Sequence, residues 1–523
     1  MKPINKRILQ EILAARFEND QHKRLCDLPH PSALKDSYKA AHRIKEALEK
    51  NQKIVIVGDY DVDGIISCVI VSEFFDDLSF DYEVKIPNRF KDGYGLSTEL
   101  IEELDADLIL TVDNGIAALD AAKLCKERGI DLIITDHHTP LATLPQAYAI
   151  INPKQESDGF PDIEICGAQV AWYLLAALKE VCKLKYDLSK FIELLAIAII
   201  ADMMELRDLN RALVRRGIER INQSKRAAFR AIKQHYQKDK FAIDNIGFLI
   251  APLINSAGRM DDANLSYRFL RTKNLSEALG YLEQIASFNE SRKDEERQLF
   301  EESLKQANAL GPCIIASGEG WHEGVLGIVA SRLAKHFKKP SFVFSQSENR
   351  LKGSARSVGK IDILNLITKA STCLQNYGGH KGAAGLSLEL DQFEALQEIL
   401  QTEGGRIPAE DFLDSDEILG VLEPEDVDFQ LLELLENFEP FGHKNPRPFF
   451  VLENLRVKNK RLLGKEEKHL KLILTKKNKV VEALFFHFDK EPQVDECISL
   501  VGSISKNEFR GLVTPQLIVR EIL

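Results

Sequence analysis

Acidic residues follow short apolar runs at four places in this chain of 523 residues. Asp59, Asp61 and Asp63 alternate in GDYDVDG, directly after KIVIV, while Asp113 follows DLILTV and Asp202 follows LLAIAIIA. If these carboxylates converge on one crevice, they repel one another, since two like charges about 4 Å apart cost about 4 kcal/mol at an effective dielectric near 20. Bound divalent cations would relieve that repulsion.

Imidazoles join the carboxylates in the run DLIITDHH, which ends with Asp136, His137 and His138. An oxygen-rich set with one or two imidazoles suits Mn²⁺ or Mg²⁺ better than zinc, which favours thiolate and histidine. Two such ions about 3.5–4 Å apart would lower the pKa of a shared water and stabilise a phosphorane-like transition state. Alone, each motif has an ordinary explanation, such as a calcium loop, a turn or a helix cap. Their combination predicts a catalytic centre with two metal ions.

The spacing of these runs is typical of strand–loop–helix units. Helical patterns at 65–75 and 117–128 separate the apolar runs, which indicates a parallel sheet covered by helices. In such sheets, ligands bind in the crevice beyond the carboxyl ends of the strands. We interpret the run before Asp202 as a further strand, and we expect every acidic loop to lie at one edge of one sheet.

Changes in polarity and in the spacing of apolar residues divide the rest of the chain. A polar, charged helical pattern over 275–310 predicts a solvated connector helix. A second α/β region opens with PCIIASG, and short strands with turns near the C-terminus predict a small all-β barrel of the OB-fold type. The predicted segments are a helical lead-in (1–48), an α/β domain that carries the acidic loops (49–270), the connector helix (271–310), a second α/β domain (311–405) and an OB-like domain (406–523).

Composition excludes several classes of protein. Against 69 Lys and Arg stand 80 Asp and Glu, and the net charge of −11 argues against coating nucleic acid by bulk charge. No apolar run approaches the roughly 18–20 residues that span a bilayer, and the N-terminal residues lack a signal-type apolar core. The eight cysteines form no C-x-x-C pair, which favours a reducing compartment. We therefore expect a cytoplasmic protein that does not enter the membrane.

In GDYDVDG, VDNG, TDHH and the later Asp202, the chain resembles the DHH phosphoesterase superfamily. GWHEGVLGIVASRLAKHFKKP (320–340), KGSARS (352–357) and YGGHKGAAG (377–385) resemble the DHH-associated domain. With INSAGRMDDA (254–263), the connector and the β module, the order of parts over 45–523 resembles the single-strand-specific exonucleases of this superfamily. The resemblance implies two α/β domains, the DHH domain with its parallel sheet and the DHH-associated domain, joined by a long helix and followed by an OB-like barrel.

The resemblance also implies roles for single residues. Asp113 would bridge two ions, Asp136 would orient the ring of His137, and His138 would face the substrate phosphate. The implied metal ligands are Asp61, Asp63, Asp113, His137 and Asp202.

One position departs from the superfamily pattern. Many members carry a histidine four residues before the first Asp of D-x-D, where this chain has Val57. Asp59 is the candidate that would replace this ligand.

Five residues are candidates for contacting substrate phosphate. Ser354 and Arg356 are two residues apart, which places a hydroxyl and an Arg fork on one side of a strand, an arrangement that suits a terminal phosphate. His380 lies among glycines in GGHKGAAG, where the backbone could approach an anion and a helix could begin. Arg89 and Arg259 could contact phosphate or could serve as structural ion-pair partners. We expect Arg89, Ser354 and Arg356 to hold a 5′-terminal phosphate, which would set the direction of hydrolysis.

The C-terminal module has a basic stretch despite the acidic whole. Ten Lys and Arg against two Glu between 456 and 479 give this stretch a charge of +8. It fits a channel for a single-stranded backbone, with Phe485 or Phe486 as a stacking platform. Alternatively, the lysines protect strand edges and the phenylalanines belong to the core. The leading candidates for contacting nucleic acid are Arg456, Lys458, Lys460 and Arg461.

The resemblance implies a metal-dependent, single-stranded-DNA-specific 5′-to-3′ exonuclease that uses two Mn²⁺ or Mg²⁺ ions and releases nucleoside 5′-monophosphates in DNA repair and recombination. Its expected partner is single-stranded DNA, with a helicase and a single-strand-binding protein as further candidates and a monomer as the favoured state. The alternatives are a DHH-type nanoRNase or phosphatase on short oligonucleotides, a pyrophosphatase, and a scaffold that binds single strands without catalysis.

Overall fold

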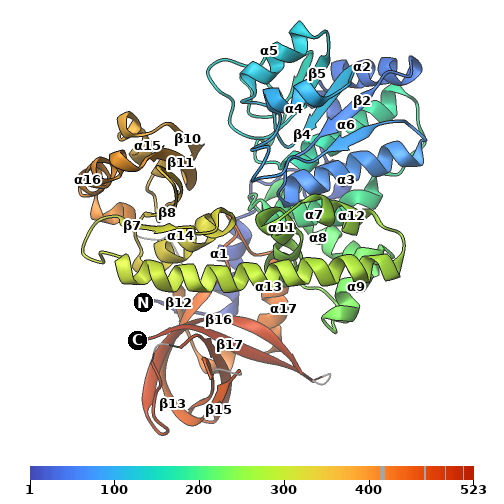
Figure 1. Ribbon diagram of the computed structural model, residues 1–523. Helices are drawn as coiled ribbons and strands as arrows, with labels where there is room; N and C mark the ends of the chain where they lie inside the picture. Colours follow the sequence, from blue (N-terminus) through green and yellow to red (C-terminus); the bar gives the residue numbers. More distant parts are fainter. Residues whose placement is uncertain (413–417, 465–466, 489, 510–511) are drawn as a thin grey trace.

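The computed structural model describes residues 1–412, 418–464, 467–488, 490–509 and 512–523. Within them, three sheets form three modules around the long helix α13 (Leu275–Gln306). Figure 1 shows α13 running beneath both α/β modules and above a β-barrel. The predicted fold, two α/β domains joined by a long helix and followed by an OB-like barrel, is confirmed.

The first module has a five-stranded parallel sheet in the order β3-β2-β4-β5-β6. Its central strands read IVIV, LILTV and DLIIT, and they are buried on both faces because helices cover both sides of the sheet. The strands are β2 (Ile54–Val57), β3 (Glu83–Lys85), β4 (Leu108–Val112), β5 (Asp131–Thr135) and β6 (Ala149–Ile151); the helices around them are α2 (Ser37–Glu49), α3 (Val62–Asp77), α4 (Thr98–Glu103), α5 (Leu119–Glu127) and α6 (Gly167–Val181).

The run before Asp202 is a helix, so its interpretation as a strand was wrong. It forms α7 (Ile192–Ala201), and Asp202 is the C-cap residue of that helix. Almost every side chain of α7 is buried, so the run is apolar all round. A short, continuously apolar run does not distinguish a buried helix from a buried strand. Asp202 therefore approaches the sheet edge from a helix end.

A helical layer follows α7 and leads to the connector. Before α11 the chain forms one turn of π-helix over 246–250. The predicted connector helix is confirmed as α13, although it is not solvated all round: Leu282 and Ile285 pack into the core of the first module, and Leu299 packs with the second. The layer consists of α8 (Asp208–Gln223), α9 (Ala227–His235), α10 (Ile243–Asn245), α11 (Ala251–Met260) and α12 (Asn264–Arg271).

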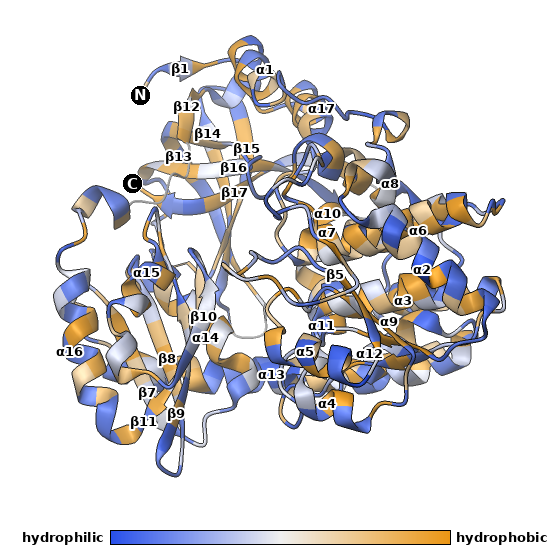
Figure 2. Cartoon of the chain, turned by 90° about the horizontal axis from the view of Figure 1, so that it is seen from above, coloured by the Kyte–Doolittle hydropathy of each residue, from blue (hydrophilic) through white to orange (hydrophobic). Residues whose placement is uncertain are grey.

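The second module has a mixed sheet in the order β10-β11-β9-β8-β7, in which only β7 and β8 pair in parallel. Figure 2, seen from above, shows this sheet on the opposite side of the molecule from the first module. The elements are β7 (Ile314–Glu319), α14 (Glu323–Phe337), β8 (Ser341–Ser347), β9 (Arg350–Arg356), α15 (Ile363–Thr368), β10 (Asn376–His380), β11 (Ala383–Glu389) and α16 (Phe393–Gly404).

The C-terminal module is a closed barrel. Its ring β13-β14-β15-β17-β16 closes because β16 also pairs with β13, which leaves no open edge among these five strands. The first residues of the chain extend this module: β1 (Pro3–Ile4) pairs with β12, and α1 (Lys6–Ala15) packs Leu9 and Leu13 into its core. The other elements are β12 (Ile418–Leu422), α17 (Phe429–Phe438), β13 (Phe449–Leu463), β14 (His469–Lys476), β15 (Lys479–Phe486), β16 (Cys497–Phe509) and β17 (Leu512–Ile522).

None of the helices in the described ranges combines the length and the apolar character that crossing a membrane requires.

Candidate metal centre and phosphate site

The carboxyl ends of β2, β4 and β5 carry the acidic and histidine residues other than Asp202, as their spacing predicted. Asp61 caps α3, and its Oδ1 accepts hydrogen bonds from the backbone N–H groups of Asp63 and Gly64. The carboxylate of Asp63 accepts from the N–H groups of Gly167 (2.6 Å) and Ala168 (2.9 Å), at the start of α6. A helix N-terminus favours a negative charge. Both carboxylates are therefore fixed by backbone donors before any ligand binds.

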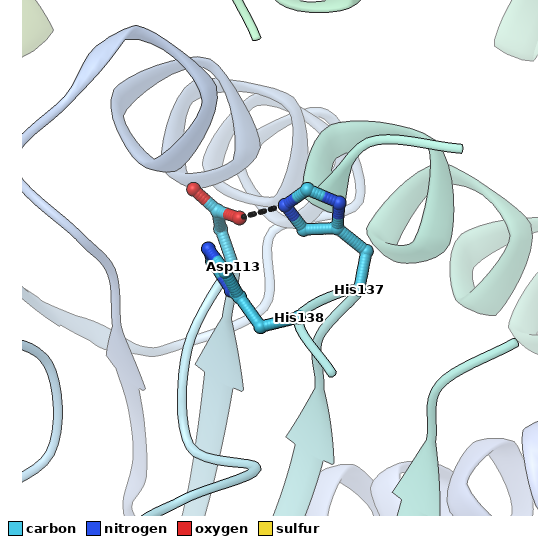
Figure 3. A group of neighbouring side chains, drawn as sticks. All are labelled: Asp113, His137 and His138. Carbon is cyan, nitrogen blue, oxygen red and sulfur yellow. Dashed lines mark ion pairs between the residues drawn. The ribbon is translucent and has the colours of Figure 1, made fainter. Parts of the chain in front are cut away.

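His137 lies at the centre of the cluster. Its Nε2 is 3.2 Å from Asp113 Oδ1, 3.5 Å from Asp202 Oδ2 and 3.8 Å from Asp63 Oδ2. Figure 3 shows the ring of His137 directed at Asp113, with His138 beside it. Among the described residues, three overlapping groups have ligand atoms within 4.8 Å of one another: Asp113–His137–His138, Asp63–His137–Asp202 and Asp59–Asp61–Asp113.

The electrostatics of the cluster fit divalent cations. Burial, together with the charge of neighbouring carboxylates, raises the pKa of Asp63 to about 6 and that of Asp113 well above its usual value. Burial lowers the pKa of His137 to about 3, which leaves its ring neutral. Asp59 Oδ1, Asp113 Oδ1 and Asp202 Oδ2 are buried, with no hydrogen-bond partner among the described residues. Buried oxygens of this kind are satisfied when they coordinate Mn²⁺ or Mg²⁺.

Asp136 supports His138, whereas the expectation that it orients the ring of His137 was wrong. Its Oδ1 lies 2.7 Å from Nδ1 of His138, and it contacts His137 only through the backbone N–H of that residue. Burial disfavours a charged ring, but the hydrogen bond and charge of Asp136 raise the pKa of His138 to about 9. The ring of His138 is half-exposed, so it can meet a substrate as a donor.

Val57 is buried in the sheet and offers no ligand where many superfamily members have a histidine. Asp59 lies close by, and its carboxylate groups with those of Asp61 and Asp113. Burial and the charge of Asp61 raise the pKa of Asp59 well above its usual value. This geometry is consistent with Asp59 as the replacement ligand, a role that stays a prediction.

Three arginines, two from the first α/β module and one from the second, lie close enough for their charges to interact. Arg89 stacks over the ring of Tyr60 at 4.0 Å and donates to the carbonyl of Gly258, and Arg259 donates to the carbonyl of Gly324. Burial, followed by the charges of Arg89 and Arg356, lowers the pKa of Arg259 to about 9. No described carboxylate lies within 4 Å of these guanidinium groups. The ion-pair alternative for Arg89 and Arg259 therefore finds no support, and like charges held together in this way favour an anion.

Ser354 and Arg356 lie on the same side of β9, and the Arg356 guanidinium donates to Ser354 Oγ at 3.0 Å. Gly327 of α14 leaves room for this fork, since a methyl group on Gly327 would lie 2.6 Å from the Arg356 nitrogen. The pairing of hydroxyl and guanidinium that the sequence predicts is present.

His380 ends β10, and the expected helix start after it was wrong: GGHKGAAG forms the β10–β11 hairpin. Glycines are compatible with either structure. Here the two strands pair antiparallel, with His380 opposite Ala383. Burial, followed by the charges of Arg356 and His138, lowers the pKa of His380, so His380 lies near both of these residues.

The basic stretch of the barrel is only partly free of acidic partners. Lys460 pairs with Glu491 at 2.7 Å, whereas Arg456, Lys458 and Arg461 have no carboxylate within 4 Å among the described residues. All three are exposed side chains of β13. Of the rest of the stretch, Lys471, Lys476 and Lys477 have acidic partners, and Lys465 and Glu466 lie outside the described residues.

The two phenylalanines differ in exposure. Phe485 is buried in the barrel core, so it is not a stacking platform. Phe486 is 49% exposed, and its ring contacts that of His469.

Sequence reasoning did not single out two residues near the cluster. Tyr94 donates from its hydroxyl to the backbone carbonyl of Asp113, and its ring meets the edge of His138. Asn255 lines a cavity of about 20 Å³ together with Asp61, Asp63 and Asp202. Asn255 lies within the motif INSAGRMDDA and Tyr94 follows Arg89 by five residues, so both segments carry a sequence signal, but only contact in three dimensions reveals that these two side chains reach the site.

Comparisons with known proteins agree with this geometry. Family models match three segments: the DHH family N-terminal domain over residues 53–199, the DHHA1 domain over 310–403 and the RecJ OB domain over 419–521. Together with the metal centre, these matches define a phosphoesterase of the DHH class.

Relatives that match nearly the whole chain show which family within this class the chain belongs to. The single-stranded-DNA-specific exonuclease RecJ of Haemophilus influenzae is 32% identical over 94% of this chain and 91% of its own length. That of Bacillus subtilis is also 32% identical, over 96% of this chain, which spans only 65% of that relative. Crystal structures of Thermus thermophilus RecJ with Mn²⁺ (30% identity, TM-score 0.84) and with Mg²⁺ (28%, 0.79) cover 99% of this chain and 76% and 74% of those chains. The chain belongs to the RecJ family of exonucleases, as its motifs predicted.

Proposed function

We propose that this protein is a metal-dependent, single-stranded-DNA-specific exonuclease that hydrolyses DNA from the 5′ end in repair and recombination. The observation that carries the proposal is the group of buried carboxylates around His137, close to three arginines that have no carboxylate within 4 Å among the described residues. A metal centre beside an anion site suits the hydrolysis of a phosphodiester.

The chain's own residues have separate tasks in this reaction. Asp59, Asp61, Asp63, Asp113 and Asp202, with the neutral ring of His137, would hold two divalent ions. When bound, such ions supply a water of lowered pKa and stabilise the charge that develops on the phosphate. His138, positioned by Asp136, would donate to a phosphate oxygen.

Direction would come from the terminal phosphate. Arg89, Arg259 and Arg356, with Ser354 and His380 nearby, form an anion site within reach of the metal centre. Charge-assisted bonds from Arg forks hold a phosphate in a defined orientation. A strand whose 5′-phosphate binds there would present its first phosphodiester to the metal centre, and each cycle would release one nucleoside 5′-monophosphate.

Product length tests the proposal. A 5′-labelled single strand is incubated with the protein and Mn²⁺, and a duplicate contains a chelator. The expected result is labelled mononucleotides with Mn²⁺ and none with the chelator, on single strands but not on blunt duplexes. Endonucleolytic fragments, 3′-first release or binding without hydrolysis would contradict it.

The same assay separates the alternatives. A nanoRNase or phosphatase would prefer oligonucleotides of a few residues, whereas the barrel with its basic strand β13 favours longer strands. A helicase and a single-strand-binding protein as partners, a monomeric state and a cytoplasmic location are further parts of the proposal.

A further inference from the structure

Asn255 is a polar residue of the metal site that the roles given so far leave unexplained. It belongs to α11 and lines the small cavity with Asp61, Asp63 and Asp202. Its Oδ1 is buried and has no hydrogen-bond partner among the described residues. A buried amide oxygen left unpaired costs free energy, so a partner from outside the chain would stabilise this atom.

The neighbours of Asn255 define the chemistry of that ligand. Val62 and Ala201 also line the cavity, and its three other polar side chains are carboxylates, which only accept hydrogen bonds when they are ionised. They therefore cannot satisfy the amide oxygen of Asn255, but a divalent cation or the water bound to it can satisfy all four groups. Amide oxygens are ordinary partners of hard cations.

The size of the cavity agrees with this chemistry. Its volume is about 20 Å³, and about 10–15 Å³ suffices for one water-sized particle. A nucleotide does not fit into such a space, whereas one hydrated position of a metal centre does.

We infer that Asn255 is a positioning residue of the metal centre, and that its Oδ1 supplies a neutral oxygen to the cation, or to its bound water, between Asp61, Asp63 and Asp202. The inference rests on the proposed function, since the cation is the one the exonuclease would use. A neutral oxygen contributes to the coordination without adding to the repulsion among the carboxylates.

Helix α11 is well placed for this task. Gly258 packs closely against the backbone of Tyr60. A methyl group on Gly258 would overlap the Tyr60 carbonyl oxygen, so only glycine fits at this contact. Arg259 lies four residues after Asn255 and therefore on the same helix face, about 6 Å further along the axis. One rigid helix thus reaches both the metal centre and the arginine group.

Calorimetric titration of the full chain with Mn²⁺, without nucleic acid, tests the inference. Asn255→Ala should weaken Mn²⁺ binding about 10- to 100-fold, the usual effect of losing a supporting group. Asn255→Asp retains an oxygen and should bind within a few-fold of the parent. Gln284→Ala, which removes an exposed amide from α13, should change nothing. Parental affinity in Asn255→Ala would overturn the inference.

Thermal unfolding separates this role from a structural one. In chelator, Asn255→Ala should melt no lower than the parent, whereas the rise in Tm that Mn²⁺ produces should shrink. If Asn255→Ala and Asn255→Ser both unfold early in chelator, the residue is structural and the inference fails. Mononucleotide release by the parent tests the proposed function independently, so the two failures are distinguishable.

Discussion

At the scale of single residues, two adjacent histidines have opposite properties. Burial lowers the pKa of His137 to about 3, so its ring is neutral and can coordinate a cation. Against the effect of burial, Asp136 raises the pKa of His138 to about 9, so that ring is protonated at neutral pH. The sequence places both after β5, but it does not show that Asp136 turns its carboxylate to the second ring.

NMR titration of the metal-free protein, prepared with a chelator, tests the charge on His138. Its ring should titrate near pH 9, and Asp136→Asn should move this pKa down, because the paired carboxylate is lost. Since the folded pKa lies above the usual 6.5, the stability that the pair contributes should be complete below about pH 6.5 and should disappear as the pH rises through 9. His138→Gln assigns the resonance. Titration near 6.5 in the parent would contradict the pairing.

At the scale of elements, apolar runs followed by acidic residues predicted β2, β4 and β5 correctly, because parallel strands buried on both faces have this pattern. The same pattern led to a wrong prediction of a strand at α7, because a helix that is buried on all sides has the same continuous apolar sequence as a buried strand. The β10–β11 hairpin was missed because glycines allow both a helix start and a tight hairpin. The meeting of the acidic residues and histidines was predictable because most of them follow sheet strands, whereas the sequence does not show that Asn255, in INSAGRMDDA, and Tyr94 pack beside them.

Strand β9 should determine the preference for the phosphorylated end. Arg356→Ala should reduce the preference for 5′-phosphate over 5′-hydroxyl strands about 10-fold or more, since a charge-assisted hydrogen bond contributes about 1.5–3 kcal/mol. The matched control is Arg350→Ala, at the other end of β9, where the arginine pairs with Glu389. Competition kinetics with both substrates measures the ratio, and an unchanged ratio in Arg356→Ala would refute this role.

The contact between α11 and α14 should fix the distance between the two α/β modules. Gly324→Ala places a methyl group on the carbonyl oxygen of Arg259, so the helices must separate. We expect lower kcat/KM on phosphorylated single strands and a lower Tm. Gly280→Ala is the control, because an added methyl group meets nothing within 4 Å on the exposed side of α13, and it should stabilise the protein by about 0.5–1 kcal/mol. A fully active Gly324→Ala would show that this contact does not position the site.

At the scale of the whole molecule, α13 contributes to the cores of both α/β modules, and the first residues of the chain complete the C-terminal one. The order of modules was predictable because each has its own pattern of strands and helices. The pairing of β1 with β12 was not, since contacts between the two ends of a chain leave no periodic signal. The domain boundaries stay predictions.

The barrel should increase the affinity for long single-stranded DNA by adding contacts to the phosphate backbone. Reversing the charge of Arg456, Lys458 and Arg461 to Glu should weaken binding to strands that reach the barrel. It should also reduce the slope of log affinity against log salt by about 2, because each lost phosphate contact changes it by about 0.7. Fluorescence anisotropy at several salt concentrations measures both. Oligonucleotides too short to reach the barrel should bind as before, and equal losses on both lengths would contradict this role.

The central claim is that the carboxylates and His137 meet around paired divalent ions. Anomalous diffraction at the manganese edge, from crystals of the protein grown with Mn²⁺, tests it most directly. We predict two peaks that share Asp113 as a ligand, and Asp113→Asn should lose at least one of them. The absence of peaks in this cluster, or peaks only elsewhere on the molecule, would contradict the account.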